Sequence, residues 1–149
     1  MNTSARNRLS SALCVIALAI SGCTKPLPSV TIQSGTKSVH TQALCWSETD
    51  QNKLRDCLTK LATAPALTGK TLSVTSGNSV GISVDPKVAE YGWQALLGGN
   101  PIFTTAKTAT YYRFKLPITS LDGKSALQII SFGPKETIRG VWLFQIKAD

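Results

Sequence analysis

Cysteine, histidine and acidic side chains are the residues of this sequence that could do chemistry, and there are few: four cysteines, one histidine and eight acids. A serine hydrolase needs a base within reach of its nucleophile. The histidine, His40, stands among polar residues in a predicted strand, and no Gly-x-Ser-x-Gly turn is present. A glycosidase needs two carboxylates flanking a cleft. The aspartates instead fall in predicted turns, on a helix face or at the last position: Asp50, Asp56, Asp85, Asp122 and Asp149. We therefore expect no enzymatic activity and no cofactor.

Cys23 follows a leader of the export type. Two arginines precede an apolar run over residues 9–20, which is too short to span a bilayer because spanning needs about 20 apolar residues. The residues Ile20-Ser21-Gly22-Cys23 resemble the lipobox of bacterial lipoproteins. That resemblance implies that a diacylglycerol is attached to the Cys23 sulfur, and that residues 1–22 are removed as a signal peptide.

The lipid implied at Cys23 determines where we expect the chain to reside. Two acyl chains hold a domain stably on a membrane, at about 0.8 kcal/mol per buried CH₂ group. Residues 23–29 contain two prolines and are expected to form an extended tether, followed by one domain over residues 30–149. We therefore expect a lipid-anchored protein of the cell membrane whose domain faces the extracytoplasmic side.

Cys45 and Cys57 remain once Cys14 leaves with the signal peptide and Cys23 carries the lipid. Outside the reducing cytosol a single pairing is available to them, which favours a disulfide. The alternative is a metal site, but His40 is the only histidine of the sequence and two thiols rarely suffice for zinc. We predict a Cys45–Cys57 disulfide that contributes about 3 kcal/mol by the chain-entropy model, and no metal.

The balance of charge is strongly basic, with a formal net charge of +8 that falls to +6 when the two arginines of the leader are removed. Phospholipid headgroups and wall polymers are the polyanions outside a bacterium, and a basic domain is attracted to both. Scattered charges are also typical of any soluble surface, and here they form no run of four. Nucleic acid is not an expected partner, because the domain has no basic stripe and no aromatic platform.

Alternation of apolar and polar residues with a period of two predicts β-strands along most of the domain. It occurs in "SVTIQSG", "TLSVTS", "SVGISV" and "TYYRFKLP", and Gly77-Asn78 between the second and third runs suggests a tight hairpin. "ALQIISF" and "GVWLFQI" are apolar on both faces and are predicted to be central strands. About seven such strands indicate a mainly β fold, an antiparallel immunoglobulin-like β-sandwich.

One segment departs from this period. "SETDQNKLRDCLTKLAT" places apolar residues at helical spacing and offers Thr49 or Asp50 as a cap, which predicts one short helix joined by Cys57 to Cys45. We expect it to pack over an edge or one end of the sandwich. "DPKVAEYGW" is predicted to make a helical turn that leads into a strand at Trp93.

Three stretches carry a resemblance to a known family: "VGISVDPKVAEYGWQALLGG", "YYRFKLP" and "RGVWLFQI". Together with the lipobox and the "CW" at 45–46, they resemble small actinobacterial envelope lipoproteins that form a domain family of unknown function. The likeness covers most of residues 38–147 and includes a Gly-x-Trp-x-Phe strand, matched by Gly140, Trp142 and Phe144. It implies an immunoglobulin-like β domain behind a lipobox, and it supplies no catalytic residue.

A candidate binding face lies on the strand "TYYRFKLP". Its period sends Tyr111, Arg113 and Lys115 to solvent together, and a tyrosine beside two cations suits an anionic or sugar-like partner. The alternative is an ordinary solvated face on which the tyrosine covers the stem of Arg113. Trp93 and Trp142 are expected to belong to the core instead. We expect a non-enzymatic envelope lipoprotein that is either a structural module or a binding module for an envelope protein or an anionic wall polymer. The alternative is a small-ligand carrier with a pocket between the sheets near Trp93.

Overall fold

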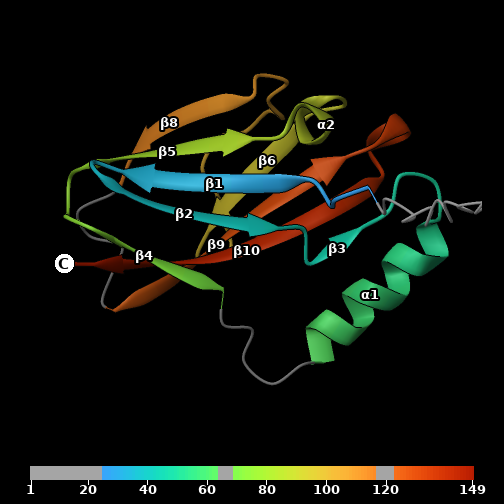
Figure 1. The fold of residues 1–149 in the computed structure, drawn as a ribbon, viewed down its shortest axis with the longest axis horizontal. Coiled ribbons are helices and arrows are strands. Elements are labelled where there is room, and N and C mark those ends of the chain that lie inside the picture. The colour runs from blue at the N-terminus through green and yellow to red at the C-terminus, as the bar shows by residue number, and fades with distance from the viewer. Residues whose placement is uncertain (1–24, 64–68, 117–122) are drawn as a thin grey trace, which may run out of the picture.

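Two β-sheets form the body of the protein, as the computed structural model shows for residues 25–63, 69–116 and 123–149 (Figure 1). The predicted signal peptide and Cys23 lie outside these described residues. The first sheet has four strands in the order β2-β1-β5-β8, with the bounds Lys37–Gln42, Ser29–Ser34, Ser79–Val84 and Tyr111–Lys115. It is antiparallel throughout.

The second sheet has six strands, in the order β3-β10-β9-β6-β7 with β4 also paired to β10. The bounds of these strands are Cys45–Trp46, Ile138–Ala148, Lys124–Phe132, Trp93–Leu97, Asn100–Pro101 and, for β4, Lys70–Val74. β9 and β10 are long and central, as their apolar sequences predict. The mainly β, two-sheet sandwich predicted from the sequence is confirmed.

The core lies between the sheets and is built by the inward residues of each alternating strand. Val30 and Ile32 of β1 face the same interior as Val80 and Ile82 of β5, and all four are buried. The opposing sheet contributes larger side chains, all fully buried: Trp93, Leu127, Ile129, Trp142, Phe144 and Ile146. Removing this apolar surface from water is the main stabilising contribution to the fold.

The predicted hairpin around Gly77-Asn78 is wrong. A turn is present, in which the Asn78 amide donates to the Thr75 carbonyl and Gly77 has a φ of +81°. It joins two different sheets, however, because β4 pairs with β10 and β5 pairs with β1 and β8. The β4–β10 pairing is parallel, so the sandwich is not wholly antiparallel. The alternation of apolar residues and the turn residues predict that a strand forms, but they do not determine which strand it pairs with.

The structure contains more strands than the seven predicted, ten in its described part. Two of the additional strands, β3 and β7, are only two residues long, and no sequence period is detectable over that length. β2, the strand expected around His40, is six residues long, but Val39 is its single strongly apolar residue, so alternation does not define its bounds. As an edge strand it buries little and needs no apolar face.

The predicted helix is α1, Gln51–Thr63, and it lies at one end of the sandwich (Figure 1). Asp50 caps it, because its Oδ1 accepts from the amides of Asn52 and Lys53 at 3.0 Å. Leu54 is its buried residue. The Cys45–Cys57 disulfide joins α1 to β3 with a Cα–Cα distance of 5.8 Å, as predicted.

The predicted helical turn is α2, Pro86–Ala89, with Asp85 as its cap. A single-turn 3₁₀ helix, Pro134–Glu136, connects β9 to β10. Among the described residues, no helix is both long and apolar enough to cross a membrane.

Candidate binding surface

Strand β8 places the three residues predicted as a binding face on one side of the four-stranded sheet. Tyr111, Arg113 and Lys115 are exposed, whereas Tyr112 and Phe114 are half-buried and pack against the core. The period predicted for this strand is therefore confirmed. Within the described residues β8 is an edge strand, since β5 is its one neighbour in the order of the sheet.

Tyr111 lies across the neighbouring strand. Its register partner is Ser83, and its ring reaches diagonally over Gly81. A Cβ added to Gly81 would lie 2.7 Å from the Tyr111 hydroxyl oxygen and 3.1 Å from its Cε2, which is closer than a side chain packs. Gly81 therefore makes room for the ring, and Tyr111 rests on the sheet while remaining 43% exposed.

Arg113 and Lys115 bring two positive charges to this edge. Their partners on β5 are Gly81 and Ser79, and neither cation has a hydrogen bond or an ion pair with any residue that the structure describes. Beyond them, the outward positions of β5, β1 and β2 hold serine, threonine, glutamine, glycine and histidine. The surface is a polar sheet face with its cations along one edge.

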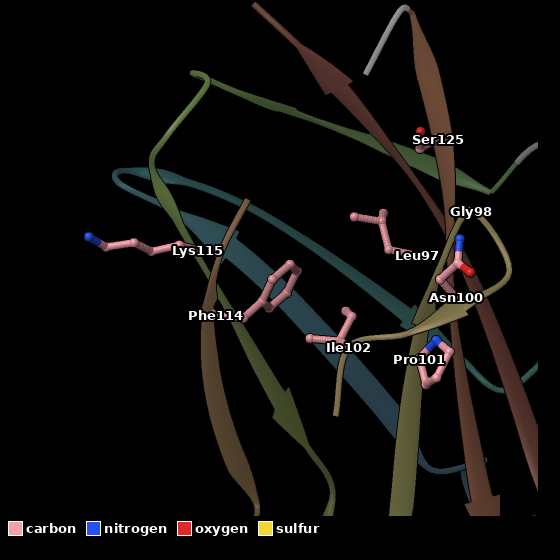
Figure 2. Close-up of a pocket in the computed structure, with 8 residues that line it drawn as sticks. All are labelled: Leu97, Gly98, Asn100, Pro101, Ile102, Phe114, Lys115 and Ser125. Atoms are coloured by element: carbon pink, nitrogen blue, oxygen red, sulfur yellow. The ribbon is translucent and has the colours of Figure 1, made fainter. Parts of the chain in front are cut away.

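A cleft of about 450 Å³ opens beside β8, between the edges of the two sheets. Figure 2 shows Phe114 of β8 and Ile102 pointing into the space between the sheets, whereas Lys115 points away from it. The cleft is lined by Leu97, Gly98, Asn100, Pro101, Ile102, Phe114, Lys115 and Ser125. It therefore combines an apolar wall with a cation at its margin.

Trp93, near which a pocket was predicted, lies in the packed core and does not line this cleft. Trp93 is fully buried, its Nε1 donates to the Ala109 carbonyl at 2.8 Å, and its ring meets Phe103 edge-on at 5.4 Å. Phe103 in turn packs on Tyr112 at 4.7 Å, and the Lys107 ammonium lies over both rings at 5.4 and 5.3 Å. Aromatic packing fills the space at this end of β6, and the cleft lies at the other end, by Leu97.

The sequence reasoning missed a buried arginine. Arg139 is 3% exposed, and its guanidinium lies between the rings of Trp46 and Tyr91 at 4.8 and 5.2 Å. Its Nη2 donates to Glu90 Oε2 at 2.9 Å, while Nε and Nη1 have no hydrogen-bond partner among the described residues. A charged residue that opens the otherwise apolar run "RGVWLFQI" was the signal for such a site.

The tether is anchored firmly to the sandwich at Pro28. Its carbonyl accepts from the Trp142 indole at 3.1 Å and from the Ala43 amide at 3.0 Å. A second cleft of about 490 Å³ lies here, lined by Lys25, Pro26, Leu27, Pro28, Trp46, Ser47, Glu48, Lys53, Asp85 and Lys87. Lys87 donates to Glu48 across this cleft, and that hydrogen bond lowers the pKa of the carboxyl and raises the pKa of the amine.

Most of the other groups considered for chemistry have structural partners, while Asp122 lies outside the described residues. His40 is exposed on β2, where its Nδ1 is 3.0 Å from the Thr31 hydroxyl. Asp50 and Asp85 cap helices, and Asp149 accepts from Lys37, which lowers the pKa of Asp149. In the described part of the chain, no group of three or more His, Cys, Asp or Glu side chains is placed to hold a metal ion.

Comparison with protein-family models gives no match, and comparison with curated proteins gives none either. Among solved structures, the chain is similar to the fibronectin(III)-like modules of CbhA from Clostridium thermocellum, with 15% sequence identity and a TM-score of 0.42. The likeness covers 58% of this chain and 92% of that chain. The β-sandwich follows from the pairing of this chain's own strands. The resemblance to actinobacterial lipoproteins stays a prediction.

Proposed function

We propose that the protein is a lipid-anchored, non-enzymatic protein of the cell envelope whose β-sandwich binds a partner outside the membrane. The edge strand β8 carries this proposal. Tyr111, Arg113 and Lys115 stand exposed on a strand that is held by the core, and the two cations have no partner among the described residues. Exposed, unpaired cations beside an aromatic ring on a rigid element are typical of a binding surface.

The tether supports the proposed anchor. Cys23 precedes Pro28 by five residues, and Pro28 is bonded to the sandwich through its carbonyl. Five residues span at most about 18 Å when fully extended. A lipid on Cys23 would therefore hold the tether end of the sandwich close to the headgroups. Strand β8 runs away from that end. Tyr111 pairs with Ser83, which lies opposite Thr31 near the start of β1, whereas Lys115 pairs with Ser79 at the other end of β5.

Replacement of the anchoring cysteine tests this part of the proposal. The Cys23→Ser protein is expected to incorporate no labelled palmitate and to leave the membrane fraction, because the serine hydroxyl cannot replace the thiol that accepts the lipid. Cys14→Ser, which changes a cysteine inside the predicted signal peptide, is the matched control and should keep both label and location. Label retained in the Cys23→Ser protein would refute the anchor.

A small-ligand carrier is the second candidate, and the cleft by Leu97 favours it. Its volume of about 450 Å³ falls within the range of about 300–1,000 Å³ common for ligand pockets. A carrier should retain its ligand during gentle purification. Native mass spectrometry of the purified protein should then show a bound small molecule that is lost in an Ile102→Trp variant, and an unliganded mass would contradict a carrier.

A further inference from the structure

We propose that the open edge of β8 binds an extended, acidic segment of a partner protein, which adds to the four-stranded sheet as a fifth strand. This inference rests on the proposed binding function and specifies the chemistry of the partner. It draws on three features of the same strand: its free backbone groups, its unpaired cations and the cleft beside it.

The backbone of β8 has hydrogen-bonding groups directed away from the sheet. The Val84 amide donates to the Thr110 carbonyl, and the Leu116 amide donates to the Asn78 carbonyl. These two bonds show that the even-numbered residues of β8 are the ones bonded to β5. Alternate residues of an antiparallel strand direct their amide and carbonyl to opposite sides. Tyr111, Arg113 and Lys115 therefore direct theirs to the open edge, and no backbone bond reaches them from the described residues.

The edges at β2 and β7 are less available to an incoming strand. On β2, the far edge of the same sheet, the Lys70 ammonium donates to the His40 carbonyl at 2.8 Å. In the second sheet, β7 has two residues and one of them is Pro101, which lacks an amide hydrogen. β8 offers three successive outward positions that no described residue bonds.

The charges of β8 select the kind of strand that can pair there. Arg113 and Lys115 lie on the same face, and no acidic side chain bonds to either within the described part of the chain. Two copies of β8 side by side would bring these cations together, and like charges on paired strands destabilise the pairing. A strand with acidic residues on that face would instead gain cross-strand ion pairs.

The cleft beside β8 can accommodate the second face of the incoming strand. Successive side chains of a strand alternate between its two faces. On the inner side of the edge, Phe114 and Ile102 line the cleft with Leu97 (Figure 2). A bound strand is thus expected to alternate acidic residues, set against Arg113 and Lys115, with apolar residues that enter the cleft.

A synthetic peptide of alternating glutamate and valine tests the proposal on the full-length protein in detergent. Calorimetry should show that it binds at least about tenfold more tightly than a lysine–valine repeat, or than a peptide with its glutamates and valines in separate blocks. Hydrogen exchange should slow at the amides of Arg113 and Lys115, since these become bonded to the new strand. Equal binding of the three peptides, or unchanged exchange at both amides, would overturn the proposal.

Two variants of β8, with one control on α1, separate the contribution of the backbone to peptide binding from the contribution of charge. Arg113→Glu/Lys115→Glu should reverse the preference towards the lysine–valine repeat, whereas Arg55→Glu/Lys60→Glu, an equal charge change on the exposed face of α1, should alter binding less than about twofold. Arg113→Pro removes an outward amide without touching the β5 ladder and should weaken binding about tenfold. Unaltered binding in both β8 variants would refute strand addition.

Crosslinking in cells distinguishes this inference from the function on which it rests. A photo-reactive amino acid is placed at Ser83, which lies opposite Tyr111 on β5. An envelope protein captured there, together with no binding of the glutamate–valine peptide, would overturn strand addition and leave the proposed function intact. Capture of nothing together with no peptide binding would contradict both.

Discussion

At the scale of single residues, the structure depends on side chains whose neighbours are distant in sequence. Tyr111 was predicted to be exposed, and it is, but its contact with Gly81 depends on the register of β5 and β8. Arg139 is buried by Trp46 and Tyr91, which belong to different parts of the chain. A period of two predicts which face a residue occupies, whereas such contacts require the pairing to be known.

Replacing Arg139 with lysine should destabilise the domain by about 2 kcal/mol. The ammonium of lysine cannot stack flat between two rings as the guanidinium does, and it would keep a charge in the same buried place. Urea unfolding of the two proteins measures the difference. Arg55→Lys, at an exposed position of α1, is the control. Equal midpoints for Arg139→Lys and the wild type would show that the stack contributes nothing.

The contact between Gly81 and Tyr111 should appear as non-additivity. Gly81→Ala puts a Cβ where the Tyr111 ring lies, so its cost should be about 1 kcal/mol greater in the wild type than in a Tyr111→Ala background. A double-mutant cycle by denaturant unfolding measures this coupling. A coupling energy of zero would mean that the ring does not rest on the glycine.

At the scale of elements, the sequence predicted the types of element better than their partners. The helix was placed correctly because its apolar residues, its Asp50 cap and Cys57 agree on one conformation. The hairpin between β4 and β5 failed because Gly77 favours a turn without specifying which sheet follows it. β8 and its exposed face were predictable from the sequence. The cleft was not, because its walls come from β7 and β8, which belong to different sheets.

Removing the disulfide should weaken the connection between α1 and β3. The Cys45→Ala/Cys57→Ala variant is expected to lose about 3 kcal/mol of stability, since the cross-link limits the freedom of the unfolded chain over a separation of 12 residues. Thermal unfolding compared with the oxidised wild type measures the loss. Reducing agent should lower the melting temperature of the wild type and leave that of the variant unchanged. An effect of the reductant on both would indicate another cause.

At the scale of the whole molecule, the ion pair between Lys37 and Asp149 joins the β1–β2 turn to the end of β10. Because the pKa of Asp149 is lowered in the folded protein, the pair stabilises the fold above the usual aspartate pKa, and this contribution disappears as the pH falls through the lowered value. Lys37→Met should therefore lose less stability than the wild type between about pH 6 and about pH 3. Melting temperatures at the two pH values test this, and parallel losses would contradict it.

In the proposed arrangement, a short N-terminal tether holds the β-sandwich at the membrane and β8 faces a partner. The mass of the protein extracted from membranes tests the first half most directly. We expect an N-terminal fragment that begins at Cys23 and carries the additional mass of a diacylglycerol on that residue. A fragment that begins at any other position, or a Cys23 without added lipid mass, would contradict the account.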